Sequence, residues 1–248
     1  MPEWADEDWV IWLSLPGNTP YQMRQAGYAA SEAPVVAVTE DHCAPDPDWV
    51  RGVIEEHEAN PDAAAIFGMV DNGSRSHLID WALYGAGYLA SAPPRPSANA
   101  NPSHANLSFK AEVIHTVAAA GDQVLEFRYV DALRRRGLTV LASDRLRVTH
   151  VQSTGLMTTS QLFFHNGRYI ASVRRERMTG KDWLRTLAPG LMAFYRTLRT
   201  LNLARSRPKL RAPIFRSAPF IYLLHTLHAS GESVGYITGP GDSASYLH

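Results

Sequence analysis

The chain has 248 residues, enough for one large hydrophobic core or for one core with a smaller appendage. Its single cysteine excludes an internal disulfide framework, and no apolar run reaches the about 18 residues of a membrane-spanning helix. Residues 1–150 carry 11 basic against 20 acidic side chains, whereas residues 151–248 carry 13 against 4, so a net charge of zero hides a strong asymmetry. This asymmetry predicts a cation-binding acidic half and a basic half that meets an anionic surface.

The first residues are acidic and lack the basic segment of a signal peptide. A lone cysteine also fits a reducing compartment. The sequence therefore predicts a cytoplasmic protein, or one held peripherally on the inner face of the plasma membrane by its basic half.

The first predicted elements are a strand, a helix and a second strand. Residues 9–15 are mostly apolar and end at a Pro-Gly turn, which predicts a strand. Residues 21–31 are expected to form a short helix. Val35–Val38 is a short apolar run rich in β-branched residues, which predicts a buried strand.

Three polar residues follow the second strand, where ligands bind in open α/β folds. Along an extended backbone, Glu40 and His42 would share one side and Asp41 would face the other. A carboxylate and an imidazole on one side can hold a divalent cation. The alternative is that the triplet only solvates the end of the strand.

The middle of the chain is predicted to contain a helix at residues 49–60, a strand at 64–70 and a helix at 77–89. Residues 90–104 are rich in Pro, Ser and Asn and have no periodicity, which predicts a loop. Loops of this length inside a compact domain are usually functional or mobile. His104, at its end, is either an ordinary loop histidine or part of a site.

A further helix is predicted within residues 121–137. Val130 and Leu133 form its apolar stripe, and Gly137 provides a C-cap. Glu126 lies in its first turn, where a carboxylate either complements the helix dipole or takes part in a reaction.

Two strands are predicted next, at residues 138–142 and 146–151. His150 lies at the end of the second strand. It is either a structural histidine or a third ligand for the cation beside Glu40 and His42.

The basic half is predicted to be helical. Residues 182–204 carry apolar side chains at steps of three or four, with a break at Pro189-Gly190. A basic linker at 205–211, a second apolar segment at 213–228 and a turn-rich ending at 231–241 are expected to follow. The apolar stripes either pack on the core or lie in a membrane interface with arginines at the headgroups.

The stretch T-E-D-H-C-A-P-D-P-D-W at residues 39–49 resembles the strand-end motif of the family 2 glycosyltransferases, which have a GT-A fold. Further segments resemble the same family: R-Q-A-G at 24–27, N-L-S-F-K at 106–110, F-F-H-N-G-R at 163–168, and a glutamate eleven residues before Gly137. The resemblance implies a GT-A-like mixed sheet flanked by helices. It implies a catalytic core at 1–155 and a basic helical extension at 156–248.

The resemblance also implies roles for individual residues. Metal ligands are implied at Glu40, His42 and His150, for Mn²⁺ or Mg²⁺, although the outer motif positions of the family are Asp. Donor contacts are implied for Arg24, Glu40, Asp41 and Arg168, and acceptor contacts for His104, Asn106 and Lys110. Glu126 corresponds to the general base that deprotonates the acceptor hydroxyl, and Asp122 is the nearby alternative.

The function implied is transfer of a sugar, with inversion, from a nucleotide-diphosphate donor to the hydroxyl of a polysaccharide, glycan or lipid-linked acceptor. The first predicted strand resembles the third of the family, so the segment that would bind the nucleotide base is expected to be missing. The alternative is therefore a non-catalytic relative that binds a membrane surface or a partner enzyme. A metal-dependent hydrolase is disfavoured by the residue spacing, and nucleic acid is not expected as a partner.

Overall fold

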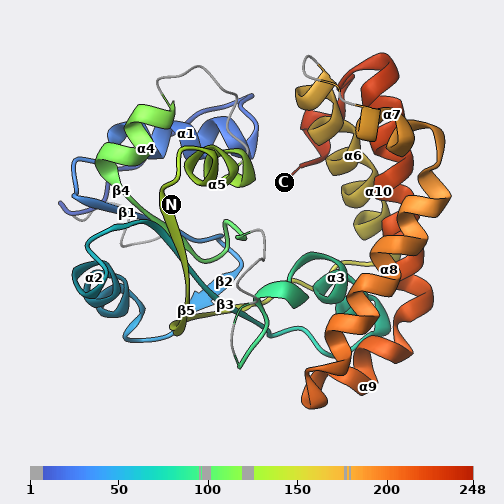
Figure 1. The fold of residues 1–248 in the computed structure, drawn as a ribbon, viewed down its shortest axis with the longest axis horizontal. Coiled ribbons are helices and arrows are strands. Elements are labelled where there is room, and N and C mark those ends of the chain that lie inside the picture. Colours follow the sequence, from blue (N-terminus) through green and yellow to red (C-terminus); the bar gives the residue numbers. More distant parts are fainter. Residues whose placement is uncertain are drawn as a thin grey trace.

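The computed structural model describes residues 8–94, 96, 102–118, 126–175, 178 and 180–247, and it describes only the backbone of 117–118, 126–128, 181, 184 and 185. A five-stranded mixed sheet is flanked by helices, and further helices form a second half of the molecule (Figure 1). The predicted α/β class with a mixed sheet is confirmed.

The strands of the sheet lie in the order β1-β4-β3-β5-β2. They are β1 (Val35–Val38), β2 (Cys43–Pro45), β3 (Ala63–Asn72), β4 (Leu107–Lys110) and β5 (Thr139–His150). β3 and β5 are parallel, and the other pairs are antiparallel. β3 is central and almost wholly buried, because its apolar sequence is covered on both faces.

Helices cover both faces of the sheet (Figure 1). One face carries α1 (Pro20–Ala30), α4 (Ala111–Ala118) and α5 (Glu126–Arg135). Tyr28, Phe109 and Tyr129 meet edge to face in the core under these helices. The other face is covered by α2 (Trp49–Ala59), whose Val53 packs in a cluster with Ile66 of β3.

Two strand predictions differ from the structure. Residues 9–15 form no strand, and Trp9 and Ile11 are exposed at 76% and 72%, so that prediction is wrong. An apolar run becomes a strand only where a sheet edge pairs with it, and no described strand pairs with this one. The separate strands predicted at 138–142 and 146–151 are one strand, β5, whose extra residues are absorbed by a register shift opposite Phe67 and Met69.

The second half of the molecule is built around α10 (Ala218–Thr238), which packs against α6 (Leu156–Arg174) and α8 (Pro189–Arg205). The other helices here are α3 (Leu78–Gly87), α7 (Gly180–Leu187) and α9 (Pro208–Arg216), with short 3₁₀ turns at Leu89–Ser91 and Ser243–Tyr246. Tyr84 of α3 packs with Ile221 and Leu224 of α10. The helix α3, which directly follows β3 in the sequence, therefore belongs to the hydrophobic core of this half.

The helical predictions are partly confirmed. The break at Pro189 is present, because α7 ends at Leu187 and α8 begins at Pro189. The linker predicted at 205–211 is largely helical, since Pro208 is a suitable first residue for α9. The prediction of a turn-rich ending at residues 231–241 is also wrong up to Thr238, because α10 continues through Gly231 and Gly235.

These glycines let α6 and α10 approach at backbone distance. A Cβ added at Gly231 would lie 2.0 Å from Phe164 O, and one at Gly235 would lie 2.2 Å from Arg168 O. From the other side, a Cβ at Gly167 would lie 2.2 Å from His228 O. The glycines are therefore packing residues rather than turn residues.

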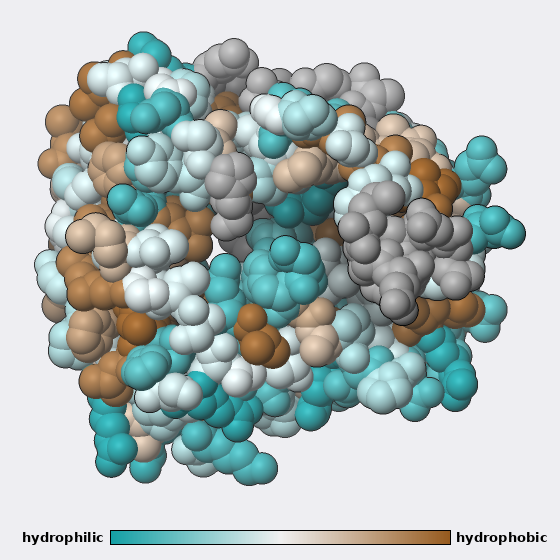
Figure 2. Space-filling view, turned by 180° about the vertical axis from the view of Figure 1, so that it is seen from behind, coloured by the Kyte–Doolittle hydropathy of each residue, from teal (hydrophilic) through white to brown (hydrophobic). Residues whose placement is uncertain are grey.

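Hydrophobic residues also lie on the outside of the helical half, where they form a brown strip along the left edge of Figure 2. None of the described helices has both the length and the apolar composition that crossing a bilayer requires.

Acid is expected to destabilise the helical half through His225. This side chain is 6% exposed, and its burial lowers its pKa to about 3. Thr197 donates its hydroxyl proton to Ala193 O, so its oxygen accepts from His225 Nδ1 at 3.0 Å. An unfolded histidine takes up a proton near pH 6.5, while folded His225 stays neutral. The free energy of unfolding therefore falls as the pH drops from about 6.5 towards 3, by up to about 1.4 kcal/mol per pH unit.

The variant His225→Gln keeps an N–H donor for Thr197 and removes this titration. Urea unfolding near pH 7.5 and near pH 5 measures the effect, and the loss between these conditions should be about 2 kcal/mol larger for the natural chain. Equal losses would show that His225 does not contribute to the acid sensitivity.

Candidate metal centre

The centre is assembled where β1 and β5 end and β2 begins. Thr39, just after β1, donates its hydroxyl to Ala105 O at 3.0 Å, and the N–H of Cys43 closes a turn onto Glu40 O at 3.0 Å. Cys43 then pairs with His150 across the antiparallel β2–β5 ladder. The turn after β1 and the end of β5 are therefore adjacent, although 110 positions separate Glu40 from His150 in the sequence.

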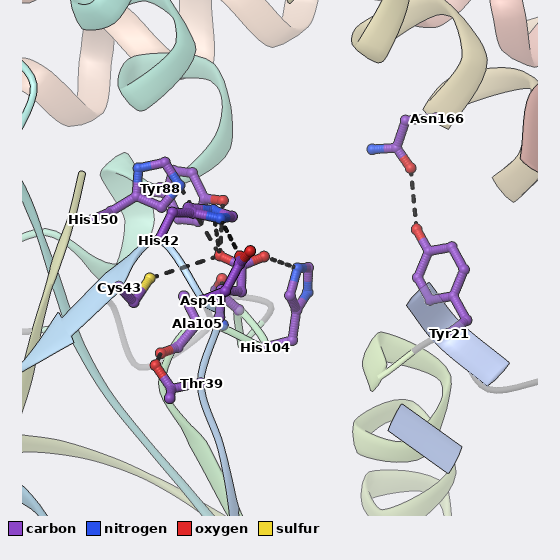
Figure 3. Close-up of polar contacts among 12 residues, drawn as sticks. Tyr21, Thr39, Asp41, His42, Cys43, Tyr88, His104, Ala105, His150 and Asn166 are labelled. Atoms are coloured by element: carbon purple, nitrogen blue, oxygen red, sulfur yellow. Dashed lines mark hydrogen bonds and ion pairs between the residues drawn. The ribbon is translucent and has the colours of Figure 1, made fainter. Parts of the chain in front are cut away.

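Several polar side chains converge on the Glu40 carboxylate, and the rings of His42, Tyr88, His104 and His150 among them are labelled in Figure 3. His104 forms an ion pair with it through Nε2. The Nε2 atoms of His42 and His150 lie 3.3 Å and 4.0 Å from Oε2. Tyr88 donates its hydroxyl to the same oxygen at 3.3 Å, and the sulfur of Cys43 lies 3.7 Å away.

The alternation predicted for the triplet agrees with this geometry. The side chains of Glu40 and His42 are 12% and 28% exposed and face each other, whereas that of Asp41 is 97% exposed. Asp41 still reaches His42 Nδ1 from outside, at 2.8 Å. His42 is thus held between two carboxylates, which fixes the ring and makes Nε2 face Glu40.

Burial and charge set the protonation states of the centre. Burial alone would raise the pKa of Glu40, but the charges and hydrogen bonds of His104 and His42 hold that pKa well below its usual range. The hydrogen bond to Glu40 raises the pKa of His42, against the opposing effect of burial. Burial lowers the pKa of His150 to about 4, so His150 is neutral and its ring can offer a lone pair.

Cys43 and Tyr88 keep their protons in this environment. Burial and the Glu40 charge raise the pKa of the Cys43 thiol to about 12. The same two causes raise the pKa of Tyr88 well above its ordinary value, so its hydroxyl is a hydrogen-bond donor to Glu40. Without a cation, Cys43 is therefore not a reactive thiolate.

The residues present fit a divalent cation. One ligand atom each from Glu40, His42 and Cys43 lies within 4.8 Å of the others. His150 is 1% exposed, and its buried Nε2 has no hydrogen-bond partner while pointing towards Glu40. A buried unpaired nitrogen is costly unless something binds it, and a cation would do so. A donor set this rich in imidazole suits a transition-metal ion such as Zn²⁺ better than Mg²⁺.

The centre opens into a cleft of about 810 Å³ between the sheet and the helical half. Tyr21 of α1 spans part of it, because its ring stacks on Tyr169 with centroids 5.3 Å apart and its hydroxyl donates to Asn166 Oδ1 at 3.2 Å (Figure 3). Arg24 lies next to Tyr21 and also lines the cleft.

The helical wall of the cleft contains two arginines and a buried glutamate. Arg196 of α8 donates to Glu232 Oε2 at 2.6 Å and to His228 Nδ1 at 2.9 Å, and Arg174 of α6 lies 3.6 Å from Glu232 Oε1. Glu232 is 1% exposed, so two guanidinium groups share one buried carboxylate. Both arginines also line the cleft.

The predicted site residues divide between the cleft and other places. Arg24, Asp41 and His104 line the cleft together with Glu40 and His42. Other predicted residues are used elsewhere by the protein. Asn106 is 1% exposed; it accepts a hydrogen bond from the Trp49 ring and donates to Met69 O and Leu146 O. Lys110 donates a hydrogen bond to Pro61 O. Arg168 donates to Gly239 O and forms an ion pair with Asp242. Asp122 lies outside the described residues, and Glu126 is the first residue of α5, with its side chain outside the description.

Sequence reasoning missed Tyr88, Arg174, Arg196 and Glu232. The helical periodicity of their segments was recognisable, but periodicity does not say which residues of four separate helices meet in one cleft. One signal was present in the sequence. Glu232 is the first acidic residue after Asp182, and an isolated acid in a basic helical segment indicates a buried ion pair.

Comparison of the chain with family models gives no match, and comparison with curated proteins gives no significant match.

Proposed function

We propose that the cleft transfers a sugar from a nucleotide-diphosphate donor to an acceptor hydroxyl with the help of a divalent cation. The observation that carries the proposal is the convergence of one ionised carboxylate and three imidazoles at the end of β1. This strand lies at the edge of the sheet and is only partly buried, not buried on both faces as the sequence predicted. The resemblance of residues 39–49 to the strand-end motif of family 2 glycosyltransferases supports the same assignment.

Glu40, His42 and His150 would hold the cation, with His104 and Cys43 within reach as further donors. A cation bound there supplies positive charge that stabilises the departing diphosphate. The resemblance implies Mn²⁺ or Mg²⁺, whereas the imidazole-rich donor set by itself also suits Zn²⁺.

The arginines would orient the donor. A diphosphate carries more negative charge than one divalent cation neutralises, and Arg24, Arg174 and Arg196 line the same cleft. Glu232 fixes the guanidinium of Arg196, so less conformational entropy is lost when an anion binds. In this proposal Arg174 and Arg196 take the phosphate-facing role that the sequence pattern suggested for Arg168.

A carboxylate must accept the proton of the acceptor hydroxyl as the sugar carbon is attacked. We assign this role to Glu126 at the start of α5, with Asp122 as the alternative. Glu126→Gln should lower turnover by about 10²- to 10⁴-fold and leave the affinity for the donor unchanged. Asp122→Asn is the matched comparison, and full turnover in Glu126→Gln would remove Glu126 from the mechanism.

Calorimetry with UDP-sugars and GDP-sugars, each with and without Mn²⁺, tests the proposed function. We expect heat of binding only when the cation is present, followed by slow release of nucleotide diphosphate when an acceptor is added. If Mn²⁺ binds but no donor gives heat, the transferase assignment fails and the non-catalytic alternative is favoured.

A further inference from the structure

Helix α8 packs on the protein with its small and polar side. Its fully buried residues are Ala193, Thr197, Thr200 and Ala204. Arg196 bonds to Glu232 of α10 at 2.6 Å, and Thr197 bonds to His225 of α10 at 3.0 Å. These contacts fix the rotation of α8 about its own axis.

Leu201 and Leu203 of α8 pack on the core, but six other large apolar residues of α7 and α8 point away from the protein. They are Trp183, Leu187, Leu191, Phe194, Tyr195 and Leu198, with exposed fractions of 50% to 78%. An ordinary surface helix has the reverse arrangement, with its large apolar residues facing the core. We call this row of six side chains the outer face. A continuous exposed apolar surface of this kind marks an interaction site.

The orientation of α7 is fixed by specific contacts as well. Asp182 is buried and accepts a hydrogen bond from Tyr236 of α10 at 2.9 Å. Ser233 donates to Thr186 O at 3.0 Å. Because Asp182 and Thr186 face α10, Trp183 and Leu187 face outward, and the outer face continues across the break between the two helices.

The charge around the outer face is of one sign. Residues 183–231 contain eight basic residues and no acidic residue. Five of the basic side chains are exposed on α8 and α9: Arg199, Arg205, Lys209, Arg211 and Arg216. In Figure 2 the hydrophobic strip of the helical half runs into a hydrophilic, teal region at its lower end.

We propose that the outer face binds the surface of an anionic lipid bilayer, with α7 and α8 lying in the plane of the interface. The leucines and Phe194 enter the acyl boundary, Trp183 and Tyr195 lie at headgroup depth, and the exposed arginines and lysine meet lipid phosphates. This binding goes beyond the proposed reaction and does not depend on it.

The charge distribution favours a bilayer over a second copy of the chain. Two copies joined through their outer faces would bring five exposed cations of each chain together with no acidic partner in the same segment. An anionic bilayer instead neutralises those cations and covers the apolar row at the same time.

The test uses the full chain and vesicles of phosphatidylcholine with or without phosphatidylglycerol. Co-sedimentation should require phosphatidylglycerol and decrease with salt. Leu191→Ser/Phe194→Ser and Arg199→Glu/Arg205→Glu should each lower the partition coefficient by about tenfold or more. Val50→Ser/Ile54→Ser, a pair also exposed but on α2 at the opposite side of the molecule, should leave it unchanged.

Two further measurements keep the result unambiguous. Circular dichroism shows whether each variant is folded. Brominated lipids should quench tryptophan fluorescence in the natural chain and quench it much less in Trp183→Phe. The proposal is overturned if the folded natural chain does not bind phosphatidylglycerol vesicles, if both double variants bind as well as it does, or if sedimentation shows a dimer that Leu191→Ser/Phe194→Ser dissociates.

Discussion

Replacing Glu40 with glutamine is expected to lower the affinity of the chain for Mn²⁺ by about 100-fold or more. Within the described residues, Glu40 is the carboxylate that His42, His104 and His150 all approach, and the substitution removes its charge. A neutral amide offers a weaker oxygen donor and no negative charge to balance that of the cation. Turnover should be lost in parallel if the proposed transfer takes place. Titration calorimetry with Mn²⁺ measures the effect.

The matched control is Glu58→Gln, the same chemical change at an exposed position on α2. It should bind Mn²⁺ as the natural chain does. Thermal melting of both variants separates loss of a ligand from loss of the fold. If folded Glu40→Gln keeps its affinity for Mn²⁺, Glu40 is not a metal ligand and the functional proposal loses its main support.

Replacing Gly231 with alanine is expected to destabilise the protein by about 2 kcal/mol or more. The new methyl group would lie 2.0 Å from Phe164 O of α6, which is backbone and cannot rotate away. The two helices would have to separate, and the cleft wall that both of them form would move with them. Chemical denaturation measures the loss.

Gly27→Ala is the control for this substitution. Gly27 also lies inside a helix, but nothing lies within 4 Å of a Cβ built there. Alanine at this position should therefore stabilise the protein by about 0.5–1 kcal/mol, through helix propensity and reduced freedom of the unfolded chain. If both alanine variants gave the same change in stability, the close α6–α10 packing would be refuted.

The sequence was sufficient for the local features near the centre. The β-branched run at Val35–Val38 predicted β1, because strand propensity is a property of a few consecutive residues. The alternation of an extended backbone predicted that Glu40 and His42 share one side while Asp41 faces the other. The side chains lie as predicted, although the backbone forms a turn from Glu40 to Cys43 instead of staying extended.

The remainder of the centre depends on long-range packing. His104 reaches Glu40 from the end of a loop with no periodicity, and Tyr88 reaches it from the end of α3. No local pattern distinguishes such residues from others in the same segments. The role of the Gly231 segment was missed for the same reason, because a glycine that admits a neighbouring helix looks like a turn glycine in sequence.

The apolar periodicity of residues 182–204 predicted the helices but left open whether the stripe faces the core or a membrane. Most of the stripe lies on the outside, while Leu201 packs on the core, because buried pairs such as Arg196–Glu232 determine which side of α8 faces inward. Periodicity gives the angular position of side chains relative to one another. Their direction in space is decided by partners far away in the chain.

Helix α8 separates two environments by little more than its own width. Arg196 on one side lines the cleft, while Leu191 and Phe194 on the opposite side form the outer face, and an α-helix with its side chains is about 10–12 Å across. If the chain binds a bilayer through this helix, the cleft lies close to the lipid headgroups and has a fixed orientation relative to the membrane. Its encounter with a lipid-linked acceptor would then become a search in two dimensions, with the acceptor's polar end arriving from the membrane side.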